Sequence, residues 1–240
     1  MPPGRWPNFL VGNHDYPRIL TKMDVQFVNA INMLLLLLPG TPTTYYGEEI
    51  GMNDIAQPTP PQDPWGRDPE RSPMQWSNAS LASFSNCTGN YDPQKCPWLP
   101  VNQDYLAGVN VQAQEQDKDS SLNLYKSLAK LRQEPTFLHG KMKYAIVDDD
   151  IFSYVKDWPG ETNYMVVINL SPTNTTHTLD LTPYIQTAEA DIAETTRLDM
   201  DPSLVVGNSI VPASVLLKTG QGIVLKWKYS PVEIWHKDEA

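Results

Sequence analysis

Long hydrophobic runs are missing from this 240-residue sequence, and so is any excess of positive charge. The most apolar stretch, residues 31–38, is far too short for a membrane span, which takes about 20 residues. The formal net charge of -10 argues against a nucleic-acid partner, because a phosphate-binding surface needs clustered lysine and arginine. His139, His177 and His236 have no metal-ligand spacing, so we expect no metal site.

Cysteine is nearly absent too, with only Cys87 and Cys96, which lie close together in a segment rich in turn residues. A loop this short is easily closed by a disulfide. Four glycosylation sequons accompany the pair, at Asn78, Asn86, Asn169 and Asn174. Together they predict a glycosylated chain in an oxidising, secreted or extracellular location. The alternative is a reduced pair with four unused sequons.

A signal peptide is not found at Met1, where the sequence MPPGRWPN is polar and proline-rich. A chain with secretory features and no leader is most simply explained by truncation. We therefore expect further sequence upstream, from a parent that is secreted or anchored to a membrane.

The first region of the chain has the pattern of alternating strand and helix. Residues 8–11 form a short apolar run that predicts a buried strand followed by a polar loop. Residues 21–38 have helical length, with Thr21 as the expected N-cap, and Pro39-Gly40 ends the helix. Residues 43–46 predict a second strand. Strand, helix and strand together are the unit from which parallel sheets are built.

The rest of the chain changes character twice. Residues 53–119 predict a long loop rich in Pro, Asp, Asn and Trp, and such loops are usually functional. Residues 120–133 predict an amphipathic helix. Short β-rich runs then follow at 142–147, 151–155, 164–168, 176–181, 209–217 and 222–227. They predict a small antiparallel sandwich, with a domain boundary near Gly140.

Asn13, His14 and Asp15 come directly after the first predicted strand, which makes them the first candidates for chemistry. In a β/α barrel, the side chains at the C-terminal ends of the strands form the active site. An acidic side chain there can stabilise a developing positive charge, and a histidine can donate hydrogen bonds to sugar hydroxyls. The triplet taken alone favours a loop or cap role over a catalytic one.

Four strings in the chain resemble the α-amylase superfamily, and within it the α-glucosidases, most closely insect-type maltases. They are FLVGNHD at 9–15, GTPTTYYGEEIGM at 40–52, RDPERSPMQW at 67–76, and WLPVN at 98–102 followed by NVQ at 110–112. With the β-rich tail, they cover essentially the whole chain. The resemblance implies an α/β plus all-β fold. Residues 1–139 would be the C-terminal portion of a (β/α)8 TIM barrel, and residues 140–240 an antiparallel β-sandwich domain.

The resemblance also implies roles for three residues. Asp15 would stabilise the transition state, His14 would hydrogen-bond the same sugar ring, and Arg71 would recognise the non-reducing-end glucose. For Arg71 the alternative is a structural ion pair with Glu70 or Asp68. The implied ligand is a small α-glucoside such as maltose, sucrose or a short oligosaccharide, and no cofactor is implied.

Retaining glycosidases need a nucleophile and an acid/base, two carboxylates about 5 to 5.5 Å apart. In this family both lie on barrel strands that precede the Asn13-His14-Asp15 region, so we expect the isolated chain to be inactive without the missing N-terminal barrel half. Two strands alone leave an unpaired sheet edge, so we also expect the first half to be loose and the helix end at 34–38 partly bare.

The predicted function is therefore one part of a retaining α-1,4-glucosidase. One alternative is a non-catalytic ectodomain like that of the heavy chains of heteromeric amino-acid transporters. Another is a short pseudoenzyme that binds sugar or protein. The presence of His14, Asp15 and Arg71 favours the enzyme, because a non-catalytic relative has no need to keep them.

Overall fold

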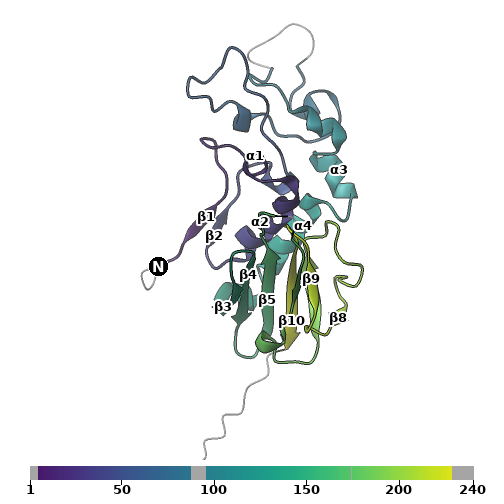
Figure 1. The fold of residues 1–240 in the computed structure, drawn as a ribbon. Coiled ribbons are helices and arrows are strands. Elements are labelled where there is room, and N and C mark those ends of the chain that lie inside the picture. Colours follow the sequence, from purple (N-terminus) through teal and green to yellow (C-terminus); the bar gives the residue numbers. More distant parts are fainter. Residues whose placement is uncertain (1–4, 88–95, 174, 229–240) are drawn as a thin grey trace, which may run out of the picture.

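The computed structural model describes residues 5–87, 96–173 and 175–228. Its N-terminal part contains two short parallel strands, β1 (Asn8–Leu10) and β2 (Thr41–Thr43), with Asn8 opposite Thr41. The connection between them contains α1 (Ile19–Lys22), a 3-10 turn and α2 (Val28–Leu37). The predicted strand–helix–strand unit is thus confirmed, and Figure 1 shows β1 and β2 side by side. The prediction that the first strand is buried was wrong, because all three residues of β1 are exposed.

The predicted limits of that helix and of the second strand were wrong. The backbone is extended at Met23 and Asp24, which separates α1 from the 3-10 turn Val25–Phe27 and from α2. Thr21 therefore lies inside α1 rather than capping a long helix. The second strand ends at Thr43, where the prediction had it begin.

The predicted long loop is confirmed up to Asn110, and its described residues contain short 3-10 turns, whereas α3 (Val111–Gln116) falls inside the predicted loop and was not predicted. The Cys87–Cys96 disulfide is formed within it, with the Cα atoms 4.9 Å apart. Helix α4 (Ser121–Leu131) follows as expected, and the Ser120 hydroxyl caps it by accepting the Asn123 N–H at 3.2 Å. The short helix α5 (Pro135–His139) leads into the sheets.

The C-terminal part consists of a six-stranded sheet and a two-stranded sheet, both antiparallel. The larger sheet has the order β3-β4-β5-β10-β7-β8, and the smaller pairs β6 with β9. The strands are β3 (Lys141–Val147), β4 (Ile151–Asp157), β5 (Thr162–Asn169), β6 (His177–Leu179), β7 (Ala190–Thr195), β8 (Ser209–Ile210), β9 (Val215–Leu217) and β10 (Gly222–Lys228). Strand β7 was not predicted, and the run at 209–217 is split between the two sheets.

The six-stranded sheet buries apolar side chains on both faces, because alternate residues of a strand point in opposite directions. Met165, Val167 and Leu225 contribute to a cluster shared with the small sheet. Tyr164, Val166 and neighbouring side chains on the other face contact the helices (Figure 1). This second cluster, which we call the helix–sheet core, consists of Ala30, Met33, Leu36, Leu37, Leu124, Leu128, Phe137, Tyr154, Tyr164, Val166, Ile168 and Val224.

The leucine-rich end of α2 is part of that core. Leu35, Leu36 and Leu37 are each at most 3% exposed, whereas Leu34 and Leu38 are only partly buried, so the expectation of a partly bare helix end holds for these two residues alone. The sheet and α4 cover Leu36 and Leu37. Among the described residues, no helix has the length and apolar character needed to cross a membrane.

Two substitutions in the helix–sheet core should have opposite effects on stability. Leu128 is fully buried, so Leu128→Ala should lower the free energy of unfolding by about 2 to 5 kcal/mol. Tyr154 is also fully buried, but its hydroxyl has no hydrogen-bond partner among the residues that the structure describes. Tyr154→Phe removes that unsatisfied group and should leave stability unchanged or raise it by about 1 kcal/mol. Urea unfolding of the two variants measures both effects, and comparable losses would contradict the described packing.

Candidate functional site

His14 and Asp15 lie in the loop that directly follows β1. The loop is a tight turn in which the Asp15 N–H donates to Asn13 Oδ1 at 2.8 Å and Asn13 forms a β-bridge with Tyr16. The side chains of His14 and Asp15 are 66% and 42% exposed, so both are accessible to a ligand. The imidazole Nε2 lies 3.4 Å from Asp15 Oδ2.

Two arginines from the long loop converge on the same carboxylate. Arg67 donates to Asp15 Oδ1 at 2.6 Å, and Arg71 donates to the same oxygen at 3.3 Å. The Arg71 Nε also donates to the His14 carbonyl at 2.8 Å. The structure therefore brings together the three residues singled out in the sequence. Among the described residues, the ion-pair partner of Arg71 is Asp15, in place of the considered Glu70 or Asp68.

Arg67 is the residue of this cluster that the sequence analysis did not single out. Its guanidinium binds Asp63 in a two-pronged arrangement, with Nε–Oδ2 at 2.8 Å and Nη2–Oδ1 at 3.0 Å, while Nη1 contacts Asp15. The hydrogen bonds from Arg67 lower the pKa of Asp63 to about 2. The sequence did offer one signal that could have identified Arg67, because it is the first residue of the RDPERSPMQW string.

Buried hydrogen bonds hold the long loop in place. Asp68 is fully buried and accepts from Gln57 Nε2 at 2.9 Å and from the backbone N–H of Gln62 and Asp63 at 2.7 and 3.0 Å. The loop that follows β2 is tied to this segment, because the Tyr46 hydroxyl donates to the Ser72 carbonyl at 2.6 Å. The two arginines are thus positioned by polar contacts rather than by a hydrophobic core.

Two buried ionisable side chains, Arg18 and Glu48, lie near the strand β2 end of the site. The Arg18 guanidinium is almost fully buried, donates to the Tyr46 carbonyl at 2.7 Å and lies 4.7 Å from the centre of the Tyr46 ring. Glu48 accepts the Tyr45 N–H at 2.9 Å, and burial raises the pKa of its carboxyl to about 7. A Cβ at Gly12 would collide with Glu48 Oε1, so the Glu48 carboxylate would have to shift to admit any larger residue there.

An aromatic cleft of about 410 Å³ adjoins Arg71. Phe84 and Trp98, which line it, flank the Cys87–Cys96 disulfide. The other lining residues are Tyr46, Glu49, Pro73, Met74, Trp76 and Pro97. Met74 is buried and packs against other apolar side chains, whereas Trp76 is about half exposed. The cleft places apolar surface next to a guanidinium that already contacts Asp15.

The predicted glycosylation sites differ in accessibility. Asn78 and Asn86 are exposed, and Asn174 lies outside the described residues. Asn169 is fully buried, and its amide nitrogen donates to the carbonyls of Thr175 and Leu217 at 3.0 Å each. A glycan on that nitrogen is incompatible with this packing, so the prediction at Asn169 was wrong.

Comparison with known families matches residues 1–140 to the Alpha amylase, catalytic domain. Maltase A1 of Drosophila melanogaster is 36% identical over 199 residues, which cover 78% of this chain and 33% of the relative. The amino acid transporter heavy chain SLC3A1 of Mus musculus is 34% identical over 232 residues, covering 94% of this chain and 32% of the relative. The chain thus spans about a third of the length of these curated relatives.

Solved structures share the fold. The isomaltulose synthase from Klebsiella sp. LX3 superposes with a TM-score of 0.70 at 22% identity, covering 93% of this chain and 43% of that chain. The likeness confirms the predicted fold, in which the end of a barrel is followed by an antiparallel β domain.

The buried Glu48 predicts a measurable pH dependence of stability. Because its pKa is raised from an ordinary 4.5 to about 7, the folded chain holds a proton there that the unfolded chain has lost. Stability contributed by this group is present below the unfolded pKa and is lost as pH rises to about 7. Glu48→Gln should remove this loss, which amounts to at most about 3 kcal/mol.

Thermal unfolding from pH 4 to pH 8 tests this. The difference between wild type and Glu48→Gln should grow across that interval, whereas Glu189→Gln, at an exposed position, should run parallel to wild type. A constant difference between wild type and Glu48→Gln would show that Glu48 titrates normally.

Proposed function

Because the chain belongs to the α-amylase catalytic-domain family, we propose that it forms part of a retaining α-1,4-glucosidase that removes terminal glucose from maltose, sucrose or short oligosaccharides. The observation that carries the proposal is the convergence of His14, Asp15 and Arg71 in the loops beyond the parallel strands. Active-site residues of β/α barrels occupy this position at the C-terminal ends of strands. The proposed location is secreted or extracellular, with glycans at Asn78 and Asn86.

Asp15 has the geometry of a charge-stabilising group. Its Oδ1 accepts from both Arg67 and Arg71, which orients the carboxylate. Among the described residues, Oδ2 has only the longer contact with His14, so this oxygen can accept hydrogen bonds from sugar hydroxyls. Glycoside hydrolysis passes through an oxocarbenium-like transition state, and a fixed carboxylate beside it stabilises the developing positive charge.

Arg71 is proposed to bind the terminal glucose. Its Nε and Nη2 are engaged with His14 and Asp15, while a guanidinium has five N–H donors in all. The remaining donors can bind hydroxyls of the same sugar ring that Asp15 contacts. We propose that His14 donates to that ring as well. Arg67, held by Asp63, is then a positioning residue that keeps Asp15 in place.

The nucleophile and the acid/base are proposed to come from outside this chain. Asp15 cannot stabilise the charge, form the glycosyl intermediate and protonate the leaving oxygen at once, and retaining hydrolysis needs two further carboxylates. We accordingly propose residues 1–139 as the end of the catalytic barrel and residues 140–240 as the β domain, with the earlier barrel strands supplied by the longer protein.

Two measurements test this. The isolated chain should release no glucose from maltose, whereas the protein translated from the longest reading frame containing it should do so. In that longer protein, Asp15→Asn should lower kcat by at least about 100-fold, because it removes the charge but keeps the shape. Asp149→Asn, in the exposed turn between β3 and β4, is the matched control and should keep full activity. Wild-type turnover in Asp15→Asn would contradict the assigned role.

A second candidate function is supported by the identity to the amino acid transporter heavy chain. In that case the longer protein would be a non-catalytic ectodomain, and His14, Asp15 and Arg71 would form a structural ion-pair cluster. The same assay separates the two: a longer protein that folds and hydrolyses no α-glucoside favours the ectodomain.

A further inference from the structure

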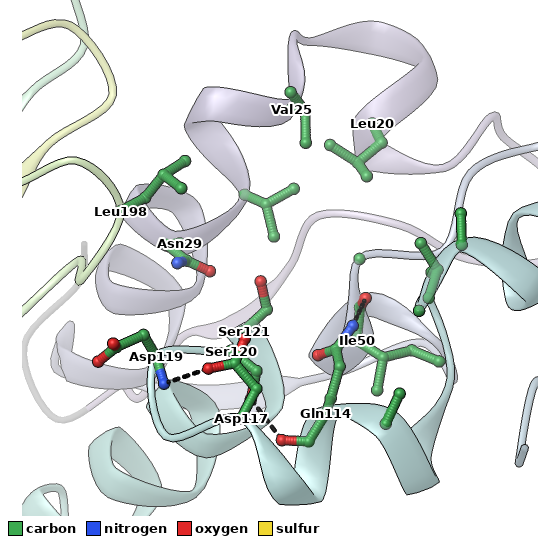
Figure 2. A pocket seen from close by; sticks show the side chains of 16 residues that line it. Leu20, Val25, Asn29, Ile50, Gln114, Asp117, Asp119, Ser120, Ser121 and Leu198 are labelled. Carbon is green, nitrogen blue, oxygen red and sulfur yellow. Dashed lines mark hydrogen bonds between the residues drawn. The ribbon is translucent and has the colours of Figure 1, made fainter.

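The cavities of this chain differ in chemistry, and those of about 300 to 1,000 Å³ are large enough for a small molecule. The cavity drawn in Figure 2, of about 510 Å³, lies between α2, α3 and the start of α4, and its walls are aliphatic and polar. The aromatic cleft, of about 410 Å³, has aromatic side chains at four of its nine lining residues. It also contains Arg71, whose Nη2 lies 3.3 Å from Asp15 Oδ1, so a ligand in the cleft lies beside the candidate site.

Three large aromatic side chains of the cleft are exposed. Trp76, Phe84 and Trp98 have exposed fractions of 49%, 46% and 53%. They come from different parts of the long loop, and Phe84 and Trp98 lie on either side of the disulfide in the sequence. Single exposed apolar residues are ordinary, whereas several that gather around one hollow leave apolar surface in water that a ligand can cover. The cleft therefore has the character of a binding surface.

A turn with an unfavourable backbone conformation holds two of these side chains. Residues 81–83 all have left-handed φ angles, between 52° and 58°, which residues other than glycine rarely adopt. Ala82 is fully buried, and its carbonyl accepts the Trp76 N–H at 3.0 Å, while the Leu81 carbonyl accepts the Phe84 N–H at 2.9 Å. Strained backbone of this kind persists where its surroundings fix it, and it is common at ligand sites. Here it fixes the backbone of Trp76 and Phe84 at the cleft.

The charged residues of the cleft are Arg71 and Glu49. Among the described residues, Nη1 of Arg71 has no hydrogen-bond partner, and Glu49 uses one oxygen to accept the Gly47 N–H at 2.7 Å. The Tyr46 hydroxyl is already engaged with the Ser72 carbonyl, and the two indole N–H groups add only donors, so side-chain acceptors are scarce. A hexose carries several hydroxyls, each of which needs a partner once its water is removed, whereas a flat apolar group needs none. The cleft therefore suits an aromatic group better than a second sugar ring.

We propose that the aromatic cleft binds the leaving group of the substrate, and that it selects α-glucosides whose leaving group is aromatic over those with a second sugar. Trp76, Phe84 and Trp98 then determine specificity, because they contact the leaving group and not the terminal glucose. This inference rests on the proposed glucosidase function, in which Arg71 binds the terminal glucose. Hydrolysis breaks the bond between the sugar carbon and the glycosidic oxygen, water supplies the new hydroxyl of glucose, and the departing oxygen takes up a proton and leaves as a phenol.

Calorimetric or ligand-observed NMR titration of the full 240-residue chain tests the proposal, since we expect that chain to bind without hydrolysis. Phenyl α-glucoside and methyl α-glucoside share the glucose and differ in the leaving group alone. Wild type should bind the phenyl compound at least about 10-fold more tightly, because aromatic walls favour a phenyl ring over a methyl group. Trp98→Ala should reduce this preference to about 3-fold or less, because it removes one of those walls, and should leave the binding of methyl α-glucoside unchanged. Trp158→Ala, in the turn after β4 and 38% exposed, is the matched control and should keep the wild-type preference.

Three outcomes would overturn the proposal: no tighter binding of the phenyl than of the methyl compound, tighter binding of maltose than of phenyl α-glucoside, or a phenyl preference that Trp98→Ala leaves unchanged. Failure of the proposed function gives a different result. A longer protein that hydrolyses no α-glucoside refutes the glucosidase function, yet a phenyl preference that is lost in Trp98→Ala still assigns the cleft to aromatic ligands. A longer protein that hydrolyses maltose and has no phenyl preference overturns the cleft proposal alone. Circular dichroism confirms the folding of each variant, and Phe84→Ala provides the same test if Trp98→Ala fails to fold.

Discussion

The packing of α2 and α4 against the six-stranded sheet determines where the rest of the chain lies. The helix–sheet core joins residues from both helices to residues of β4, β5 and β10. Polar contacts reinforce it: Arg132, which directly follows α4, donates to the carbonyls of Leu36, Leu38 and Gly40 at the C-terminal end of α2. Burial lowers the pKa of that guanidinium, a cost that these hydrogen bonds offset. The sheet thus covers apolar side chains of both helices, which also contact each other.

The candidate site is built differently. Because α2 is held against the sheet, the two strands on either side of it in the chain, β1 and β2, have fixed positions. The loops that follow these strands meet beyond the strand ends. There the contacts are hydrogen bonds and ion pairs, from the buried Asp68 to the Arg67–Asp15 pair. Such contacts are directional, which orients the Asp15 carboxylate and leaves one of its oxygens open to solvent. An apolar core fixes the positions of the helices and strands, and a polar network sets the geometry of the functional groups in the loops.

Local signals explain what the sequence could predict. Strand β1, helix α4, the disulfide and most strands of the β domain follow from patterns within a few residues, and the four strings correctly indicated the family. The predictions that failed concern residues whose environment is set by contacts with residues far away in the sequence. The Asn169 sequon says nothing of burial, and the contact between Arg67 and Asp15 joins residues 52 positions apart. The leucine run is covered partly by strands of the β domain, and the hydrophobic pattern of α2 itself carries no information about those strands.

The hydrogen bond from the Asn29 amide to the Thr196 carbonyl spans 167 positions, and the helix–sheet core spans a similar distance. During synthesis, Leu37 therefore leaves the ribosome about 185 residues before β10 begins. At translation rates of about 5 to 20 residues per second, roughly 10 to 40 seconds separate the leucine run from the last of its partner strands, β10. Strands β4 and β5 are made earlier and can cover part of α2 in the meantime. The helix–sheet core can therefore be completed only when the synthesis of this part of the chain is almost finished.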